Sequence, residues 1–212
     1  IEGLFSGGQF NGSSGYEEAA SQGLIAGINA ARKLQGKEGI VIDRSQGYIG
    51  VLIDDLVTKE SHEPYRMMTS RAEYRLLLRQ DNADIRLTKI GYEVGLIDEE
   101  RYQKLLKKEE MIEKEIERVE HTNVGTTEAV QALLESYEST PLTSGTTLAE
   151  LIRRPELSYE KIAPIDKHRE ELPYDVKEQV DINIKYDGYI KRQMRQVEQF
   201  KNCLLYTSDA AD

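Results

Sequence analysis

Residues 7–20 read GGQFNGSSGYEEAA, a glycine-rich turn that runs into the start of a helix. Leu4 and Phe5 before the turn resemble the end of a buried strand, and small residues at helical spacing follow it. We therefore predict a strand at 4–8, a loop at 9–15 and a helix at 16–34. Such a turn offers unpaired backbone N–H groups and a positive dipole end to an anionic or polar ligand.

Two amides in this turn, Gln9 and Asn11, can each donate and accept hydrogen bonds toward such a ligand. The turn is not the dinucleotide fingerprint G-x-G-x-x-G, because Phe10 stands where a glycine is needed. A tight structural turn would explain the same residues. The pattern alone leaves both interpretations open.

Composition limits the class of protein. The 212 residues include 28 Lys and Arg against 38 Asp and Glu, which gives a net charge of −10. A single Cys excludes an internal disulfide, and three His far apart in sequence argue against a metal site. No apolar run approaches the roughly 20 residues of a membrane span, so we expect a cytoplasmic protein without membrane association.

The two ends of the sequence differ from its interior. The chain starts with Ile1 rather than Met, and we expect it to be a piece of a longer protein. The helical periodicity stops near Asn202, and residues 203–212 share nothing with what precedes them. We interpret them as a non-native tail.

Helices dominate the rest of the pattern. Apolar stripes predict long helices from about 98 to 119 and from 176 to 201, and shorter helices at 128–137, after Thr147 and after Ser158. Residues 36–50 look like a hairpin, and Asp54 and Asp55 are explained by a turn or cap. The prediction is a strand-loop-helix unit followed by a helical domain.

A basic island lies in this acidic chain between residues 65 and 89, with six bases against three acids. Ser70 and Glu73 form a capping-box pattern that predicts a helix to about Leu78. That helix would place Arg71, Arg75 and Arg79 on one face, with Arg66 just upstream. Such a row suits phosphates, although a solvated, salt-bridged face explains it as well.

Four stretches go beyond physical pattern: residues 8–30, 48–59, 63–79 with 82–84, and 185–193. In this order they closely resemble the GidA/MnmG family of tRNA uridine 5-carboxymethylaminomethyl modification enzymes. The resemblance covers residues 3 to about 202. It implies that residues 1–44 are the end of an FAD-binding, Rossmann-like α/β domain. Residues 45–202 would then be a helical C-terminal domain that binds tRNA and a partner, which makes the chain mostly α.

The resemblance also implies an activity. The family works as a homodimer with the GTPase MnmE, and uses FAD, NADH and methylene-tetrahydrofolate to modify C5 of the wobble uridine of tRNA. On this basis we assign cofactor binding to Gly8, Gln9, Asn11, Gly12, Gly15 and Tyr16, and tRNA binding to Arg66, Arg71, Arg75 and Arg79. No catalytic residue and no metal ligand are assigned.

Departures from the family pattern limit what this chain does by itself. It lacks an N-terminal G-x-G-x-x-G, the family's reactive cysteines and the NADH region, so we expect it to be inactive alone. A non-catalytic helical module that binds tRNA or a protein partner is the alternative. Another flavin oxidoreductase would explain residues 9–20 but not residues 71–84.

Overall fold

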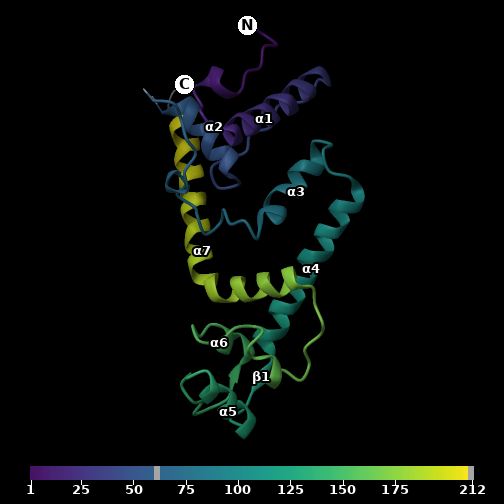
Figure 1. Cartoon of the computed structure of the whole chain (residues 1–212), viewed down its shortest axis with the longest axis vertical. Helices are drawn as coiled ribbons and strands as arrows, with labels where there is room; N and C mark the ends of the chain where they lie inside the picture. Colours follow the sequence, from purple (N-terminus) through teal and green to yellow (C-terminus); the bar gives the residue numbers. More distant parts are fainter. Residues whose placement is uncertain (60–62, 210–212) are drawn as a thin grey trace. The chain divides into compact units, whose positions relative to one another are not determined.

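The computed structural model of the chain describes residues 1–59 and 63–209, with side chains as far as 203 (Figure 1). The chain divides into two compact units. The first comprises Ile1–Tyr102 with Gln196–Asp212, and the second comprises Gln103–Arg195. Both are mainly helical, as predicted. The predicted boundary between residues 44 and 45 stays a prediction.

The first unit is built around the helix that follows the glycine turn. Its elements are η1 (Gly8–Asn11), α1 (Tyr16–Leu34), α2 (Tyr48–Thr58), η2 (Thr69–Arg71), α3 (Ala83–Glu93), the start of α4 (Glu99–His121) and the end of α7 (Tyr174–Asp209). The helix predicted at 16–34 is confirmed. α1 and α2 lie side by side (Figure 1), and a small core of Val51, Ala72 and Leu78 packs against Tyr48 and Met67.

Two predictions at the start of the chain are wrong. Residues 4–7 are not in a strand, because a strand requires a hydrogen-bonded neighbour and no described segment pairs with them; residues 8–11 form a 3-10 turn instead. Residues 36–50 form no hairpin. Asp43 Oδ1 accepts from the backbone N–H groups of Ser45 and Gln46, which closes a turn that leads directly into α2.

The predicted turn at Asp54 and Asp55 is wrong as well, since both residues lie inside α2. The apolar residues on either side of them recur at helical spacing along residues 48–58, which favours a helix over a turn. α3 was not predicted at all.

The helix predicted from Ser70 to Leu78 does not form. Only the single turn of η2 is present, and Ala72 is already extended. The reason is a tertiary contact: Arg44 Nη2 donates to the carboxylate of Glu73 at 2.7 Å and to the carbonyl of Arg71 at 3.1 Å. A helix would need that carbonyl for its own hydrogen bond, and a capping box would need that carboxylate.

The second unit confirms most of the remaining helices. It contains most of α4, then β1 (Asn123–Val124), α5 (Glu128–Ser136), β2 (Thr146–Thr147), α6 (Leu148–Ile152), η3 (Ala163–Ile165) and the first part of α7. β1 and β2 pair antiparallel. The hydroxyls of Thr127 and Thr147 accept from backbone N–H groups and cap α5 and α6. After Ser158 there are turns and the short η3 rather than an α-helix.

A continuous apolar core holds this unit together. Its most buried members are Val119, Leu134, Leu148, Leu151, Ile152, Leu157, Ile162, Val176 and Val180. Charged groups border the core: Arg118 donates to Glu115 and Asp166, and the Tyr159 hydroxyl donates to Glu115 Oε1 at 2.6 Å. Each buried carboxylate therefore has a partner, as burial of charge requires.

α7 continues to Asp209, so the backbone marks no boundary at 203. The non-native origin of residues 203–212 stays a prediction, and 210–212 lie outside the described residues. Among the helices described, none combines the length and apolarity needed to cross a bilayer.

Replacing Leu134 tests the core of the second unit. Its side chain is 0 % exposed in α5, so Leu134→Ala should lower the free energy of unfolding by about 2–5 kcal/mol. Urea unfolding followed by circular dichroism measures this. Leu106→Ala on α4, where the residue is 38 % exposed, is the control. Equal losses from the two variants would contradict the packing described here.

Candidate functional site

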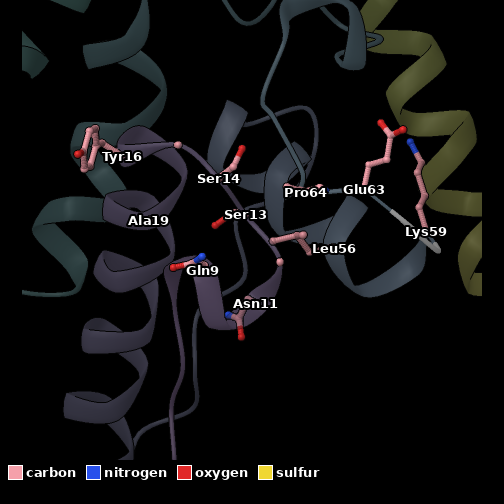
Figure 2. Close-up of a pocket in the computed structure, with 12 residues that line it drawn as sticks. Gln9, Asn11, Ser13, Ser14, Tyr16, Ala19, Leu56, Lys59, Glu63 and Pro64 are labelled. Atoms are coloured by element: carbon pink, nitrogen blue, oxygen red, sulfur yellow. The ribbon is translucent and has the colours of Figure 1, made fainter.

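The glycine turn forms one wall of a pocket of about 690 Å³ (Figure 2). The turn and the N-terminus of α1 lie on one side, and the end of α2 and the segment after residue 62 lie on the other. The lining residues are Gln9, Asn11, Gly12, Ser13, Ser14, Gly15, Tyr16, Ala19, Leu56, Lys59, Glu63 and Pro64. Five of the six predicted cofactor residues are therefore brought together. Gly8 is buried and does not line the pocket.

A buried glutamine of α1 holds the turn in shape. Gln22 Oε1 accepts from the backbone N–H of Gly8 at 2.9 Å and from Asn11 Nδ2 at 3.0 Å, and Gln22 Nε2 donates to Ser13 Oγ at 2.9 Å. Ser13 Oγ in turn donates to the carbonyl of Gly8. Sequence reasoning missed Gln22. Its signal was a polar residue within the stripe of small residues that packs α1 against its neighbours.

Two glycines of the turn need their special backbone conformation. Gly8 and Gly12 both have a φ of +77°, in the left-handed region that favours glycine. A Cβ on Gly8 would press on Ala19, whereas the space over Gly12 is open. Gly8 thus serves packing, and Gly12 leaves the backbone accessible from the pocket.

The segment around Tyr65 pairs with the turn as a short parallel bridge. The backbone N–H of Tyr65 donates to the carbonyl of Gly12 at 2.8 Å, and the N–H of Ser14 donates to the carbonyl of Tyr65 at 3.2 Å. Two of the stretches quoted for the family resemblance, about 50 residues apart in the chain, therefore form one structural unit.

The first turn of α1 carries a buried carboxylate. Glu18 is 2 % exposed, and its Oε1 accepts from the backbone N–H of Met67 at 2.7 Å. The backbone N–H groups of Met67 and of Glu18 itself lower the pKa of this carboxyl despite its burial, and the nearby Arg66 guanidinium adds to the effect. A Cβ on Gly15 would lie 1.7 Å from Glu18 Oε2, so any side chain at the N-cap would displace the Glu18 carboxylate from its present position.

A second buried carboxylate, that of Asp55, supports the segment around Tyr65. Asp55, whose side chain is 0 % exposed, accepts from the Tyr65 hydroxyl at 2.8 Å and forms ion pairs with Arg44 at 2.6 Å and Lys59 at 2.7 Å. Burial raises the pKa of Asp55, but the hydrogen bonds from Lys59, Arg44 and Tyr65 outweigh it and leave the pKa lowered. For Tyr65, burial and the Asp55 carboxylate both raise the pKa.

Arg44 ties the same cluster to the basic island. It also donates to Asp54 and Glu73. Burial lowers the pKa of this guanidinium, and the hydrogen bonds to Glu73, Asp55 and Asp54 more than offset that, so the pKa is raised. Arg44 was not singled out from the sequence, and Asp55 was interpreted only as part of a turn or cap, since only the folded chain brings these residues together with Tyr65.

The four predicted tRNA-contacting arginines do not share a helical face. Arg71 stacks on the Tyr65 ring at 4.3 Å and donates to the carbonyl of Arg66. Arg79 is paired with Asp81 at 3.1 Å. Arg66 and Arg75 are exposed, and Arg66 lies against the N-cap Gly15 at the edge of the pocket. Their role in tRNA binding stays a prediction.

The pocket offers binding groups rather than reactive ones. Its donors are backbone N–H groups, amides, hydroxyls and the Lys59 ammonium, and α1 begins at the pocket without a side-chain cap, while the N–H of Glu18 in its first turn is taken by the Glu18 carboxylate. Carbonyl or phosphate oxygens suit this donor set. Within the part of the chain that the structure describes, no three His, Cys, Asp or Glu gather to hold a metal.

Comparison with known proteins gives consistent matches. Residues 99–194 match the family described as "tRNA modifying enzyme MnmG/GidA C-terminal helical domain", and residues 1–38 match "Glucose inhibited division protein A". The tRNA uridine 5-carboxymethylaminomethyl modification enzymes MnmG of Lachnoclostridium phytofermentans and Caldicellulosiruptor saccharolyticus are 71% and 63% identical over 95% of this chain and 32% of their own length.

Solved structures agree with the sequence matches. Aquifex aeolicus GidA in crystal form II superposes with a TM-score of 0.83 at 42% identity, over 95% of this chain and 31% of that one. Crystal form I gives a TM-score of 0.79, again at 42% identity, over 95% of this chain and 30% of that one. The chain thus spans about a third of the length of the proteins it matches.

The buried Asp55 carboxylate should make the first unit sensitive to acid. Its folded pKa lies below its ordinary value of 3.8, so the ionised group stabilises the fold above that value. The contribution is lost as the pH falls from about 4 through the folded pKa. Unfolding measured from pH 7 down to pH 3 should show stability falling below about pH 4.

Asp55→Asn should lower stability at pH 7 and make the acid dependence shallower, because the ionised partner of Arg44 and Lys59 is gone. Asp54→Asn, next to it on α2 and 42% exposed, is the control and should cost less at pH 7. An Asp55→Asn protein with the stability and acid dependence of the unsubstituted chain would contradict this account.

Proposed function

Because this chain belongs to the MnmG/GidA family and spans about a third of the length of its curated relatives, we propose that it is part of an FAD-dependent tRNA-modifying enzyme. The enzyme adds a carboxymethylaminomethyl or aminomethyl group to C5 of the wobble uridine, together with the GTPase MnmE. The observation that carries the proposal is the pocket at the glycine turn, which gathers five of the predicted cofactor residues.

The donor set of this pocket fits part of FAD. The uncapped N-terminus of α1 presents N–H groups that suit the carbonyl oxygens of a flavin ring or the oxygens of its phosphates, and the open space over Gly12 lets such a group approach the turn. Gln9 adds an amide that can donate and accept, whereas the Asn11 amide donates to Ser6 and Gln22 and helps to shape the wall. When bound, FAD supplies the redox chemistry of the reaction. The NADH and methylene-tetrahydrofolate of the proposal are assigned to no residue described here.

The residues of this chain hold and shape that wall. Gln22 fixes the turn from the side of α1, and the Tyr65 segment fixes it from the other side through backbone pairing. Asp55 anchors Tyr65 and, with it, the end of α2 that carries Lys59 into the pocket. A wall fixed on both sides keeps its N–H donors aimed without reorganisation, which is what binding of a rigid ring needs.

The exposed arginines of the basic island support tRNA as the substrate. Arg75 is exposed, Arg66 is exposed although it lies 3.8 Å from the Glu18 carboxylate, and Arg71 keeps a third of its side chain exposed beside Tyr65. Arg79 is committed to Asp81, which makes it the weakest of the four candidates. The enzyme of this proposal is a cytoplasmic homodimer, and no described residue is assigned to its interface with the second copy or with the GTPase.

A chimera tests the function directly. The matched 201-residue segment of the Lachnoclostridium phytofermentans relative is replaced by this chain. The chimera should retain flavin and should restore wobble-uridine modification in a strain that lacks the gene, measured by mass spectrometry of tRNA nucleosides. The isolated chain should be colourless, because it supplies only one wall of the cofactor site.

In the same chimera Gln9→Ala should weaken flavin retention, because it removes an amide that faces the pocket. Gln35→Ala, at the C-terminal end of α1 and away from the pocket, is the matched control and should change nothing. A folded chimera without flavin and without modification would overturn the proposal.

The exposed arginines predict salt-dependent tRNA binding. Arg66→Ala with Arg75→Ala in this chain should weaken tRNA affinity about tenfold or more, and lower the slope of log K against log salt by one to two. The double variant Lys33→Ala with Lys37→Ala removes the same charge at the far end of α1 and should have little effect. Equal effects of the two double variants would assign the loss to net charge alone.

A further inference from the structure

A basic run of the chain lies on α7, in the second unit. Residues 185–195 read KYDGYIKRQMR and carry four bases against one acid, in a chain of net charge −10. The single acid, Asp187, is tied to Lys191 at 2.8 Å. The run falls in one of the stretches that carry the family resemblance, and the proposed function assigns it no role.

One face of this run lines a shallow pocket of about 500 Å³ in the second unit. Lys185, Gly188, Tyr189 and Arg192 are spaced at i, i+3, i+4 and i+7, so they share that face of the helix. Arg153, at the end of α6, closes the pocket from the other side. Three cations and one aromatic ring thus line one depression together with Ile184 and Asp187, and the Asp187 carboxylate is paired with Lys191.

Gly188 at the middle of this face is unexplained by packing. Glycine inside a helix is destabilising compared with alanine, and a Cβ at Gly188 would meet nothing within 4 Å. No left-handed conformation requires it either. The missing side chain leaves the helix backbone open at the floor of the depression, which is the use of glycine where a ligand must approach closely.

One of the three cations of the pocket has no partner within the fold. Arg192 is exposed and makes no hydrogen bond or ion pair with any residue that the structure describes. Tyr189 is 59% exposed beside it. The other two cations line the pocket while paired with acids, Arg153 with Glu150 and with Glu120 at 3.5 Å, and Lys185 with Asp181 at 3.3 Å.

We propose that this pocket binds the sugar-phosphate backbone of an RNA. Arg192 supplies the planar fork that binds a phosphate through two hydrogen bonds, Arg153 and Lys185 add charge, and Gly188 lets the strand approach the helix. Tyr189 offers a face on which a base can stack. The inference rests on the proposed function in one respect: it takes tRNA as the RNA that is bound.

The residue types favour RNA over an acidic protein surface. Lysine pairs alone would serve a carboxylate, whereas an unpaired arginine beside an exposed aromatic ring and a bare stretch of backbone matches phosphate and base together. The basic groups recognise backbone, so the site does not depend on the identity of the modified uridine.

Binding of two labelled RNAs to the full 212-residue chain tests the site: an unmodified tRNA and a 12-residue oligoadenylate that holds no uridine. Fluorescence anisotropy over a range of salt gives affinity and slope for each. Arg192→Ala should weaken both several-fold and lower the salt slope by about one. Gly188→Leu fills the depression without a change of charge and should weaken both as well, with helix content by circular dichroism unchanged.

The matched control is Arg195→Ala, which removes the same charge from an exposed residue of the same helix that lies outside the pocket. The site is overturned if Arg195→Ala and Arg192→Ala have equal effects, if Gly188→Leu binds RNA normally, or if the unsubstituted chain binds neither RNA. Displacement of oligoadenylate by polyglutamate at equal charge concentration would also overturn it, in favour of an acidic protein partner.

Failure of the site and failure of the proposed function give different results. Loss of oligoadenylate binding in Arg192→Ala supports the site even if the chimera proves inactive. Normal tRNA binding by Arg192→Ala and Gly188→Leu removes the site and leaves the modification activity standing.

Discussion

The geometry of the first unit depends on the buried carboxylate of Asp55. Its charge is out of reach of water, so it persists only because Arg44, Lys59 and the Tyr65 hydroxyl all donate to it. Those three partners come from three separate segments, and the carboxylate therefore fixes their positions against α2. Tyr65 carries the constraint onward, because its backbone pairs with the glycine turn. The wall of the pocket is thus set by a charge that never faces the ligand.

Local signals in the sequence were sufficient where the decisive interactions are local. The long apolar stripes of α4 and α7 and the threonine caps of α5 and α6 lie within a few residues of what they stabilise, and these helices were predicted. The segment after Ser70 failed for the opposite reason. Its capping box was present, but Arg44, about 30 residues earlier, took both the Glu73 carboxylate and the Arg71 carbonyl. No local pattern contains that competition.

The candidate site was likewise predicted where its features are local and not predicted where they depend on distant contacts. The turn itself was predicted from its glycines and amides, since backbone freedom and donor chemistry are properties of those residues alone. The structural roles of Gln22, Glu18 and Tyr65 were not predicted, because they depend on partners that only the fold supplies. The glycines of the turn are present for different structural reasons: Gly15 leaves room for the Glu18 carboxylate, whereas Gly12 has a left-handed φ and faces open space. A motif glycine therefore identifies a backbone constraint, and only the structure says which constraint.

Net charge is a poor guide to the partners of this chain. At −10 it would repel a polyanion from a distance, yet Coulomb interactions are screened beyond roughly 8–10 Å at physiological salt. Within that range a phosphate meets only the groups beside it. Around Arg66 and around Arg192 those groups are exposed guanidinium ions, while the acids nearby are paired, Glu18 with a backbone N–H and with Arg66 itself, and Asp187 with Lys191. Acids that are paired within the protein contribute little to the local electrostatic potential, so exposed arginines dominate it. A protein with a negative net charge can therefore still present basic sites.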